Sequence, residues 1–320
     1  MIGGAPHFSS DELMAVTFDP ASPWPARLRL LNLKPWFYLA PALGLLFIWV
    51  YGPLGYALWL SFHEWNMLPF LQPRAVGLLN YERLVTLPQT GQALRNTAFY
   101  LLGLLPLTVA LPVFIAILTQ DLQGRWRNLY RALIFLPLII APVVAAAVWR
   151  WLLDPQFGLV NAVIGAFGLE PVRFLNDPNF ALWSIVWITG WKLMGFSTLI
   201  VSAALSSINP SLIEAARIDC ASEWEVTRHI RLPLLSPTIF LLVLLTIMVG
   251  AQWTFTYIHV LTQGGPLDSS TNIYYLLWQF GFGSLAAGWA SAAGMILFVG
   301  FGVVGLALIW IMNRVTFHDN

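Results

Sequence analysis

The feature that most constrains this chain is a series of apolar runs, each about as long as a bilayer is thick. A transmembrane helix needs about 20 apolar residues to cross the hydrocarbon core. Charged side chains make up only 10% of the 320 residues, whereas a soluble domain carries roughly 25%, so they are too few to cover a water-facing surface. The chain is therefore predicted to be an all-α, polytopic membrane protein. Six runs are long enough to form transmembrane helices, at residues 36–60, 97–119, 132–149, 180–205, 234–258 and 289–312.

The basic residues indicate how these spans are oriented, because Lys and Arg gather in the cytoplasmic loops of membrane proteins. With the N-terminus inside, ten of the 16 basic residues fall in cytoplasmic segments and five outside, while Lys192 lies within the fourth span. Residues 1–35 are polar and lack the apolar core and cleavage site of a signal peptide. We therefore expect a cytoplasmic tail at 1–35, a six-span domain at 36–315 and a second cytoplasmic tail at 316–320.

Two further features belong to the predicted membrane domain. The runs 159–169 and 273–282 are too short to span, which fits interfacial or re-entrant helices on the outer side. Each proline inside a span frees a backbone carbonyl. This is compatible with bent helices around a cavity and equally with ordinary kinks in a packed bundle. These prolines are Pro41, Pro53, Pro106, Pro112 and Pro142.

The loop between the fourth and fifth spans, residues 206–233, contains two successive helix starts. Two Ser-x-x-Glu patterns, beginning at Ser211 and Ser222, match the capping box, in which each side chain bonds the other residue's backbone N–H. Pro210 suits a first helical turn, and Pro233 predicts a break before the fifth span. The loop is thus expected to form two short helices on the cytoplasmic face, suited to docking into another protein. The alternative is a simple connector.

This loop and several segments outside it resemble one family of transport proteins. Glu214-Ala215-Ala216, Asp219 and Ile230-Arg-Leu232-Pro233 are similar to the EAA loop of ATP-binding cassette (ABC) importer permeases. Residues 131–137, 149–155 with 158–161, and 261–266 look like the carbohydrate and glycerol-phosphate branch, the maltose-type permeases that depend on a binding protein. The resemblance covers about residues 36–315. One departure is Cys220, where the family has glycine; a left-handed turn costs a residue with a side chain about 1 to 2 kcal/mol, so we expect a different turn there.

The resemblance implies a division of labour among several chains. The helix around Glu214 would dock into a cytoplasmic ATPase, with Ala215 and Ala216 allowing close approach. The alternative is that Glu214 only caps its own helix. The coupling residues would be Glu214, Ala215, Ala216, Asp219, Cys220, Ile230, Leu232 and Pro233. ATP and Mg would bind the ATPase, with no cofactor on this chain. The other implied partners are a second permease chain, a second ATPase subunit, an extracytoplasmic solute-binding protein and the lipid of a bacterial cytoplasmic (inner) membrane.

The residues themselves argue against several other functions. A phosphate-binding loop needs Gly-Lys followed by Ser or Thr, and the only lysines are Lys34 and Lys192, neither in that context. His63-Glu64 lacks a second histidine at position 67, so no helical zinc pair is predicted. A net charge of +1 without a basic block excludes nucleic acid as the main partner, and the lone cysteine excludes an internal disulfide. A membrane-embedded enzyme stays open as the alternative of a different class.

Polar side chains inside the fourth and fifth spans are candidates for a substrate path, because such groups usually face protein or water. Hydrogen-bonding groups flanked by aromatic rings are what a sugar needs, and the family's substrate contacts come from the same two spans. If the solute is instead glycerol 3-phosphate or a related phosphodiester, Lys192 would supply the charge. There are two alternatives to a substrate path. The aromatic residues are enriched at membrane interfaces regardless of a ligand, and Lys192 would pair with a carboxylate of a neighbouring chain. The candidates are Thr189, Lys192 and Phe196, and then Gln252, Trp253, Thr256 and Tyr257, with His259 on the same helical face.

Overall fold

The computed structural model describes residues 34–120, 122 and 124–315, so the predicted tails lie mostly outside the described residues. The described chain divides into two units, residues 34–54 and 55–315, with the boundary inside one helix. The first unit contains α1 (Lys34–Leu46), the π-helical segment η2 (Phe47–Tyr51) and the first residues of α2 (Gly52–Ser61). It is helical throughout, as the first apolar run predicts.

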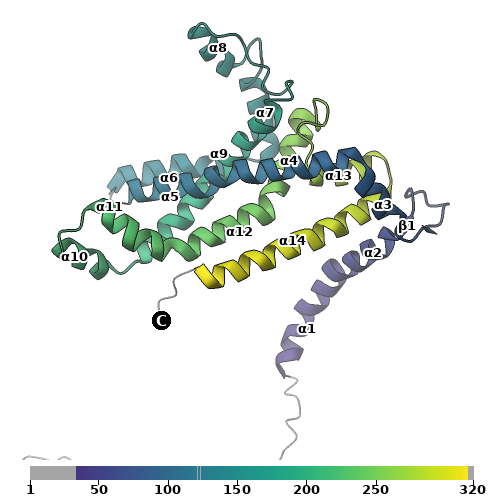
Figure 1. Cartoon of the computed structure of the whole chain (residues 1–320), viewed down its shortest axis with the longest axis horizontal. Helices are drawn as coiled ribbons and strands as arrows, with labels where there is room; N and C mark the ends of the chain where they lie inside the picture. Colours follow the sequence, from purple (N-terminus) through teal and green to yellow (C-terminus); the bar gives the residue numbers. More distant parts are fainter. Residues whose placement is uncertain (1–33, 121, 123, 316–320) are drawn as a thin grey trace, which may run out of the picture. The chain divides into compact units, whose positions relative to one another are not determined.

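Among the described residues of the second unit, the helices are joined by loops and by one two-stranded hairpin, in which β1 pairs antiparallel with β2. Its long helices run alongside one another, with α10 and α11 at one end and α3 and α13 toward the opposite end (Figure 1). After α2 its elements are β1 (His63–Glu64), β2 (Arg74–Ala75), α3 (Leu79–Thr86), α4 (Pro88–Leu105), η3 (Pro106–Ala110), α5 (Leu111–Thr119), α6 (Gly124–Ile139), α7 (Pro142–Leu152), α8 (Leu159–Ala166), α9 (Ala181–Ser207), α10 (Pro210–Ile218), α11 (Glu223–Val226), η4 (Thr227–Arg231), α12 (Leu232–Tyr257), η5 (Ile258–Thr262), α13 (Ile273–Trp278), η6 (Gln279–Gly283) and α14 (Ala287–Val315).

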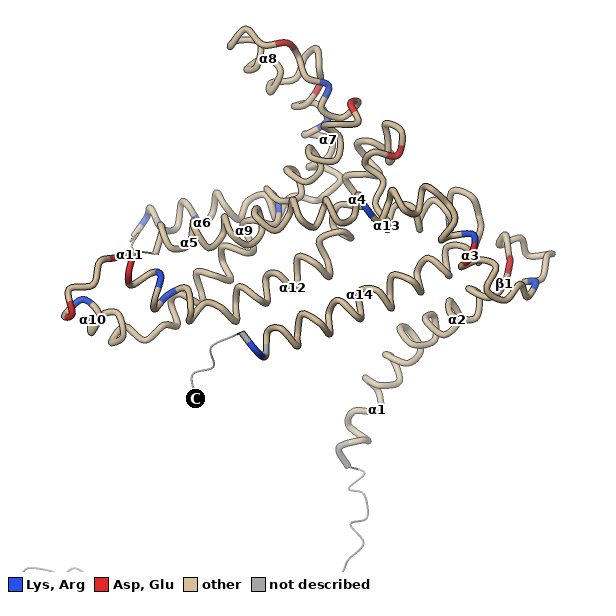
Figure 2. The backbone as a smooth tube through the Cα atoms, viewed as in Figure 1, with Lys and Arg blue, Asp and Glu red and all other residues tan. Residues whose placement is uncertain are grey.

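The predicted all-α membrane fold is confirmed. Among the described residues, five continuous helical stretches are long and apolar enough to cross a membrane: Trp36–Ser61, Pro88–Thr119, Ala181–Ser207, Glu223–Thr262 and Ala287–Met312. Acidic and basic residues gather around α10 and α11 and around α3, β1 and α8, while α12 and most of α14 are nearly bare of them (Figure 2). The two short runs form α8 and, with η6, α13, and neither reaches spanning length.

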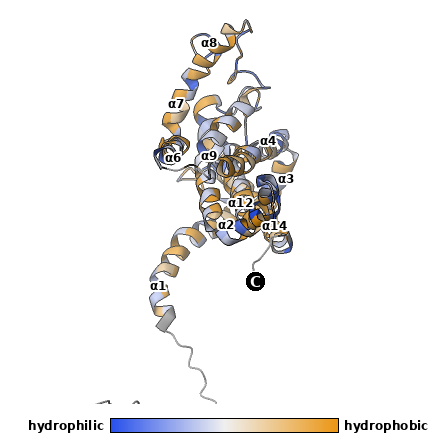
Figure 3. Ribbon diagram, turned by 90° about the vertical axis from the view of Figure 1, so that its left-hand side faces the viewer, coloured by the Kyte–Doolittle hydropathy of each residue, from blue (hydrophilic) through white to orange (hydrophobic). Residues whose placement is uncertain are grey.

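The third predicted span differs from the expectation of one straight helix. The run 132–149 is divided between α6 and α7, which meet at an angle of 99°. Pro142 begins α7, and its ring disfavours the helical conformation in the residue before it; Ala141 accordingly has ψ 136°. The two helices together therefore form a sixth span only if a broken helix is counted as one span. Apolar residues continue along α7 and α8 beyond the bend (Figure 3).

The core of the second unit lies where α4, α9 and α12 pack together. Tyr100, Ile185 and Tyr257, one from each helix, are fully buried there. Helix α6 approaches α9 closely at Gly195, where an added Cβ would collide with the carbonyl oxygen of Ile134. This close contact holds the second half of α6, which leads into the bend, against the middle of the fourth span.

Candidate functional site

The segment between α9 and α12 forms the two predicted short helices, although the first begins differently from the prediction. Asn209, not Ser211, caps α10: its side chain accepts a hydrogen bond from the backbone N–H of Ser211 at 3.1 Å. Because Pro210 occupies the first helical position, the cap moves two residues toward the N-terminus. The second capping box is confirmed, since Ser222 and Glu225 bond each other's backbone N–H at the start of α11.

Cys220 makes the left-handed turn that the family glycine would make, so the expectation of a different turn was wrong. Its φ is 58°. The backbone N–H groups of Cys220 and Ala221 donate to the carbonyl oxygens of Arg217 and Ala216, at 3.1 and 3.0 Å. This is the Schellman arrangement, which satisfies the last carbonyls of a helix. These two hydrogen bonds offset the cost of the side chain, so α10 ends in a left-handed turn although the residue there is not glycine.

The predicted break at Pro233 is also absent. The chain continues from α11 through η4 into α12, giving one helical stretch. In η4 the backbone widens to a π turn, and the N–H of Leu232 reaches the carbonyl oxygen of Thr227, five residues back. The wider turn relieves the clash that a proline ring makes with the preceding turn of an α-helix. As a result α11 is continuous with the fifth span.

Glu223 links the first short helix to the start of that stretch. Its carboxylate bonds Arg217 of α10 at 2.8 Å and Arg231 of η4 at 3.0 Å. The side chain of Arg231 is only 4% exposed and also donates to the Thr227 hydroxyl at 3.0 Å. A buried, hydrogen-bonded guanidinium holds a more fixed geometry than an exposed ion pair. The two arginines thus join α10 to the fifth span through one carboxylate.

The outward side of this coupling segment, residues 206–233, carries apolar side chains. Ile218 is 81% and Trp224 67% exposed. The carboxylate of Glu214 makes no hydrogen bond or ion pair with any described residue, so it does not form the predicted cap on its own helix. Exposed apolar groups beside an unpaired charge are suited to a protein partner. Of the other predicted coupling residues, Ala215, Asp219 and Cys220 are exposed, and Ala216, Ile230, Leu232 and Pro233 are half-buried.

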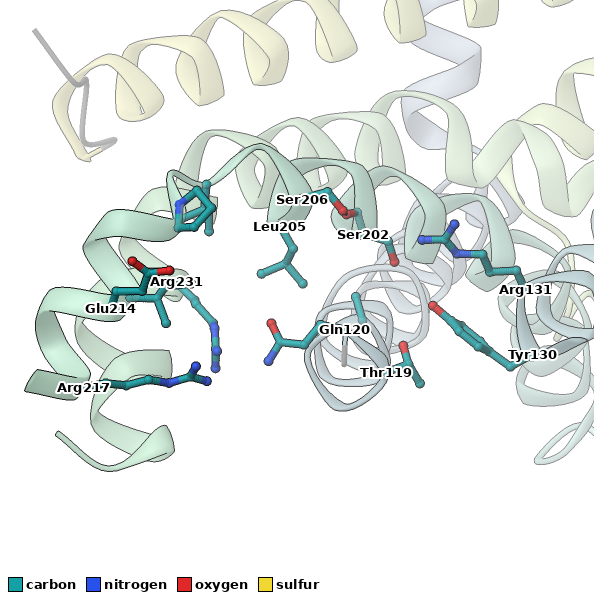
Figure 4. Close-up of a pocket in the computed structure, with 14 residues that line it drawn as sticks. Thr119, Gln120, Tyr130, Arg131, Ser202, Leu205, Ser206, Glu214, Arg217 and Arg231 are labelled. Atoms are coloured by element: carbon teal, nitrogen blue, oxygen red, sulfur yellow. The ribbon is translucent and has the colours of Figure 1, made fainter. Parts of the chain in front are cut away.

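A polar hollow of about 340 Å³ lies beside the coupling segment. Figure 4 shows Glu214, Arg217 and Arg231 on one side of it, and Tyr130 and Arg131 of α6 on the other. The remaining walls come from α5 and α9, so any shift of α10 changes the shape of the hollow. Sequence reasoning did not place Arg131 or Arg231 at a site, although both lie in segments that resemble the family and both add to the excess of basic residues in the inner loops.

Lys192 was predicted for the substrate path, but its side chain hydrogen-bonds to the protein backbone. It is 1% exposed. Its ammonium group donates to the carbonyl oxygens of Pro137 and Leu138, at 3.0 and 3.1 Å, and to that of Ile140. Pro137 and Leu138 lie in the last turn of α6 and Ile140 follows it directly, so these carbonyls lack a helical partner where the helix ends before the bend. All three donors of the ammonium are therefore used, and none is left for a solute in this conformation.

The other predicted path residues divide into two groups. Phe196 and Trp253 lie together on a largely apolar hollow of about 320 Å³ between α9 and α12. Gln252 is exposed next to Trp253, and Thr256, one turn further along α12, is half-buried. In contrast, Thr189 and Tyr257 are buried in the core, and neither hydroxyl has a hydrogen-bond partner among the described residues. His259 is half-buried between aromatic rings. Within the described residues, no group of His, Cys, Asp or Glu side chains is arranged to hold a metal ion.

Comparisons with known proteins agree on one family. Residues 99–316 match the family described as the binding-protein-dependent transport system inner membrane component. The sn-glycerol-3-phosphate transport system permease protein UgpA of Pectobacterium atrosepticum is 32% identical over 276 residues, covering 86% of this chain and 92% of that protein. The trehalose/maltose transport system permease protein MalF of Thermococcus litoralis is 31% identical over 254 residues, covering 77% and 84%.

A solved structure supports the same assignment. One chain in the crystal structure of a bacterial ABC transporter involved in the import of the acidic polysaccharide alginate matches with a TM-score of 0.77 and 26% identity, over 88% of this chain and 96% of that one. Members of this family are transport subunits of the inner membrane and not enzymes, so the membrane-embedded enzyme is set aside. The chain belongs to the family of binding-protein-dependent transport system inner membrane components, the permeases of ABC importers.

Proposed function

We propose that the chain is one of two permease subunits in an ATP-driven importer and forms half of the translocation path for a carbohydrate. The observation that carries this is the coupling segment: α10 exposes Ile218 and the unpaired carboxylate of Glu214 while remaining tied to the fifth span through Glu223. When a partner displaces a surface helix of this kind, the displacement is transmitted to the membrane helix that is tied to it. The partner that fits is a cytoplasmic ATPase subunit.

The other partners follow from the same proposal. One relative was crystallised as a bacterial alginate ABC transporter in complex with an alginate pentasaccharide-bound periplasmic protein, and its matching chain has a TM-score of 0.75 and 25% identity, over 88% of this chain and 94% of that one. We infer an assembly of two permeases, two ATPases that hold ATP and Mg, and an extracytoplasmic binding protein. Both termini of this chain would be cytoplasmic, in agreement with the excess of basic residues on that side.

For the path itself, we propose that the solute passes along the hollow at Phe196 and Trp253, with Gln252 and Thr256 supplying hydrogen bonds. Closure of the ATPases on ATP would rock the fourth and fifth spans and open the path outward, and hydrolysis would reverse the movement. The relatives include carriers named for a disaccharide, an acidic polysaccharide and glycerol 3-phosphate. The engagement of Lys192 with backbone carbonyls favours the carbohydrate over a phosphate ester that would need this cation.

Replacing Gln252 by alanine tests the path. Loss of an amide that bonds a solute hydroxyl costs roughly 1 to 3 kcal/mol, so uptake should fall about tenfold. The measurement is uptake of radiolabelled oligosaccharides into vesicles containing the assembled importer, its binding protein and ATP. Gln156→Ala, an equally small change in the segment between α7 and α8, should transport normally. Normal uptake by Gln252→Ala would show that the path does not run along this face of α12.

A further inference from the structure

A third hollow, larger than the two described above, lies at the opposite end of the helices from the coupling segment. It has a volume of about 770 Å³ and is formed by the first turns of α4, the start of α9 and the loop after η5. Ligand pockets are typically about 300 to 1,000 Å³, so the space is sufficient for an oligosaccharide unit. The side chains that bear on its chemistry are Gln92, Arg95, Asn96, Phe99, Asn179 and Trp183.

Two aromatic rings lie on the wall of this outer hollow. The rings of Phe99 on α4 and Trp183 on α9 have centroids 6.4 Å apart and are inclined at 48°. Trp183 is half exposed. Together they offer apolar faces from two helices, and the C–H face of a sugar ring packs on such surfaces by burying apolar area. Helix α4 stays close to α9 further along, at Gly103, where an added Cβ would lie 2.8 Å from the Trp183 ring. The rings therefore lie at the rim of a fixed helix crossing.

Arg95 gives the hollow a positive charge. Its guanidinium lies 5.3 Å from the centre of the Phe99 ring. Among the described residues Arg95 takes part in no ion pair; the three that occur involve other residues. A guanidinium held over a ring keeps its N–H groups free for a planar, two-oxygen acceptor such as a carboxylate. This contrasts with Lys192, whose ammonium group is fully bonded inside the protein.

The amides of the hollow are held with their oxygens free. Asn96 donates through Nδ2 to the carbonyl oxygens of Asp268 and Thr271, at 3.0 and 2.9 Å, and Gln92 donates through Nε2 to that of Leu267 at 3.1 Å. These bonds tie α4 to the loop after η5 and fix the orientation of both amides. Their side-chain oxygens accept no hydrogen bond from any described residue, so they can accept from the hydroxyl groups of a ligand.

We propose that this hollow is an outer subsite for a saccharide that carries a carboxylate, with Arg95 binding the acid and Phe99 and Trp183 stacking on the sugar rings. The inference rests on the proposed function, because it places this end of the helices on the side from which solute arrives. It assigns the selection of acidic over neutral sugars to Arg95, on the second span. Lys192 does not take part.

Saturation-transfer NMR tests the subsite. The assembled importer in nanodiscs of zwitterionic lipid, without its binding protein, is titrated with trigalacturonate or with maltotriose. Trigalacturonate should receive saturation from the protein. Arg95→Gln should weaken its binding about tenfold, because a charge-assisted, two-oxygen contact is lost. Arg95→Lys, which keeps the charge, should retain part of the affinity. Maltotriose should bind more weakly than trigalacturonate. Its affinity should be the same for the unaltered protein, Arg95→Gln and Arg95→Lys.

Arg74→Gln is the matched control, because Arg74 is an exposed arginine on β2 that does not line the hollow; it should bind trigalacturonate normally. An absence of saturation transfer, or equal binding by Arg95→Gln and the unaltered protein, would overturn the proposal. So would displacement of trigalacturonate by added phosphatidylglycerol, which would identify a lipid headgroup as the occupant. The binding protein is then added to the same samples, and its stimulation of ATP hydrolysis is measured. If the binding protein stimulates hydrolysis but no sugar binding is detected, only the subsite proposal is wrong. If the binding protein does not stimulate hydrolysis, the proposed importer function is wrong.

Discussion

Replacing Glu214 by lysine is expected to lower solute uptake by the assembled importer about tenfold or more, while the chain still inserts into the membrane. The Glu214 carboxylate is exposed on α10 and bonds no described residue, so the change removes no internal contact. We expect the main effect at the docking surface, where a contact of about 1.4 kcal/mol changes an equilibrium constant tenfold. Lysine also places positive charge near the positive end of a helix dipole. Uptake, ATP hydrolysis and membrane insertion are measured in the same vesicles.

Glu170→Lys provides the matched control for this prediction. Glu170 is an exposed acid in the segment between α8 and α9, far along the chain from the coupling segment, and the substitution changes the charge by the same amount. It should leave uptake and solute-stimulated hydrolysis unchanged. If Glu214→Lys also transports normally and hydrolyses ATP with normal stimulation, the segment 206–233 is only a connector and the coupling proposal is wrong.

The second large effect is expected at Lys192. Substitution by methionine keeps the length of the side chain but removes the donors that bond the carbonyl oxygens of Pro137, Leu138 and Ile140. Hydrogen bonds to a charged group contribute about 1.5 to 3 kcal/mol each, so a loss of roughly 3 kcal/mol or more is expected even after the backbone relaxes. The bend between α6 and α7 should loosen. The yield of folded chain and its thermal unfolding midpoint, followed by size-exclusion chromatography after heating, should both fall clearly.

Transport by the Lys192→Met protein that still assembles distinguishes a structural role of Lys192 from a role in solute binding. If Lys192 only holds the end of α6, the assembled fraction of Lys192→Met should transport at a near-normal rate per molecule. Lys192→Arg, which restores a cation, should recover part of the yield. A variant that assembles fully and hydrolyses ATP, yet transports nothing, would show that the ammonium group binds the solute. That result would favour the glycerol-phosphate alternative.

The spans could be predicted because bilayer thickness alone sets the length of an apolar run. The bend at Ala141 could not be read from hydropathy, because the residues on both sides of Pro142 are equally apolar. A proline in such a run is compatible with a kink or a break, and neighbouring helices decide between them. The same holds for Pro233, where a single π turn in η4 replaces the predicted break.

The coupling segment was partly predictable because helix caps depend on residues a few positions apart. The box at Ser222 formed as expected. The turn at Cys220 was mispredicted because intrinsic preference was weighed without the two backbone hydrogen bonds that favour the left-handed conformation. The link from Arg217 through Glu223 to Arg231 had no sequence signal, since three charges within fifteen residues can pair in several ways.

The predicted substrate path was less accessible to sequence reasoning. Helical spacing predicts Thr189, Lys192 and Phe196 near one face of α9, but of the three only Phe196 lines one of the hollows described above, and the other two are buried. The carbonyl oxygens that bind Lys192 lie 52 to 55 residues earlier in the chain. Every residue carries a carbonyl group, so composition gives no indication that these particular ones are unpaired.

The most direct test of the account is a cross-link from the coupling segment to the ATPase. A photoreactive p-benzoylphenylalanine is placed at Ile218, which is 81% exposed, or at Phe157, which is 78% exposed between α7 and α8. After illumination of the assembled importer in membranes, the adduct is identified by mass spectrometry. We predict a cross-link to the ATPase subunit from position 218 and none from position 157. An assembled complex in which position 218 captures no ATPase, or position 157 captures it equally, would contradict the account.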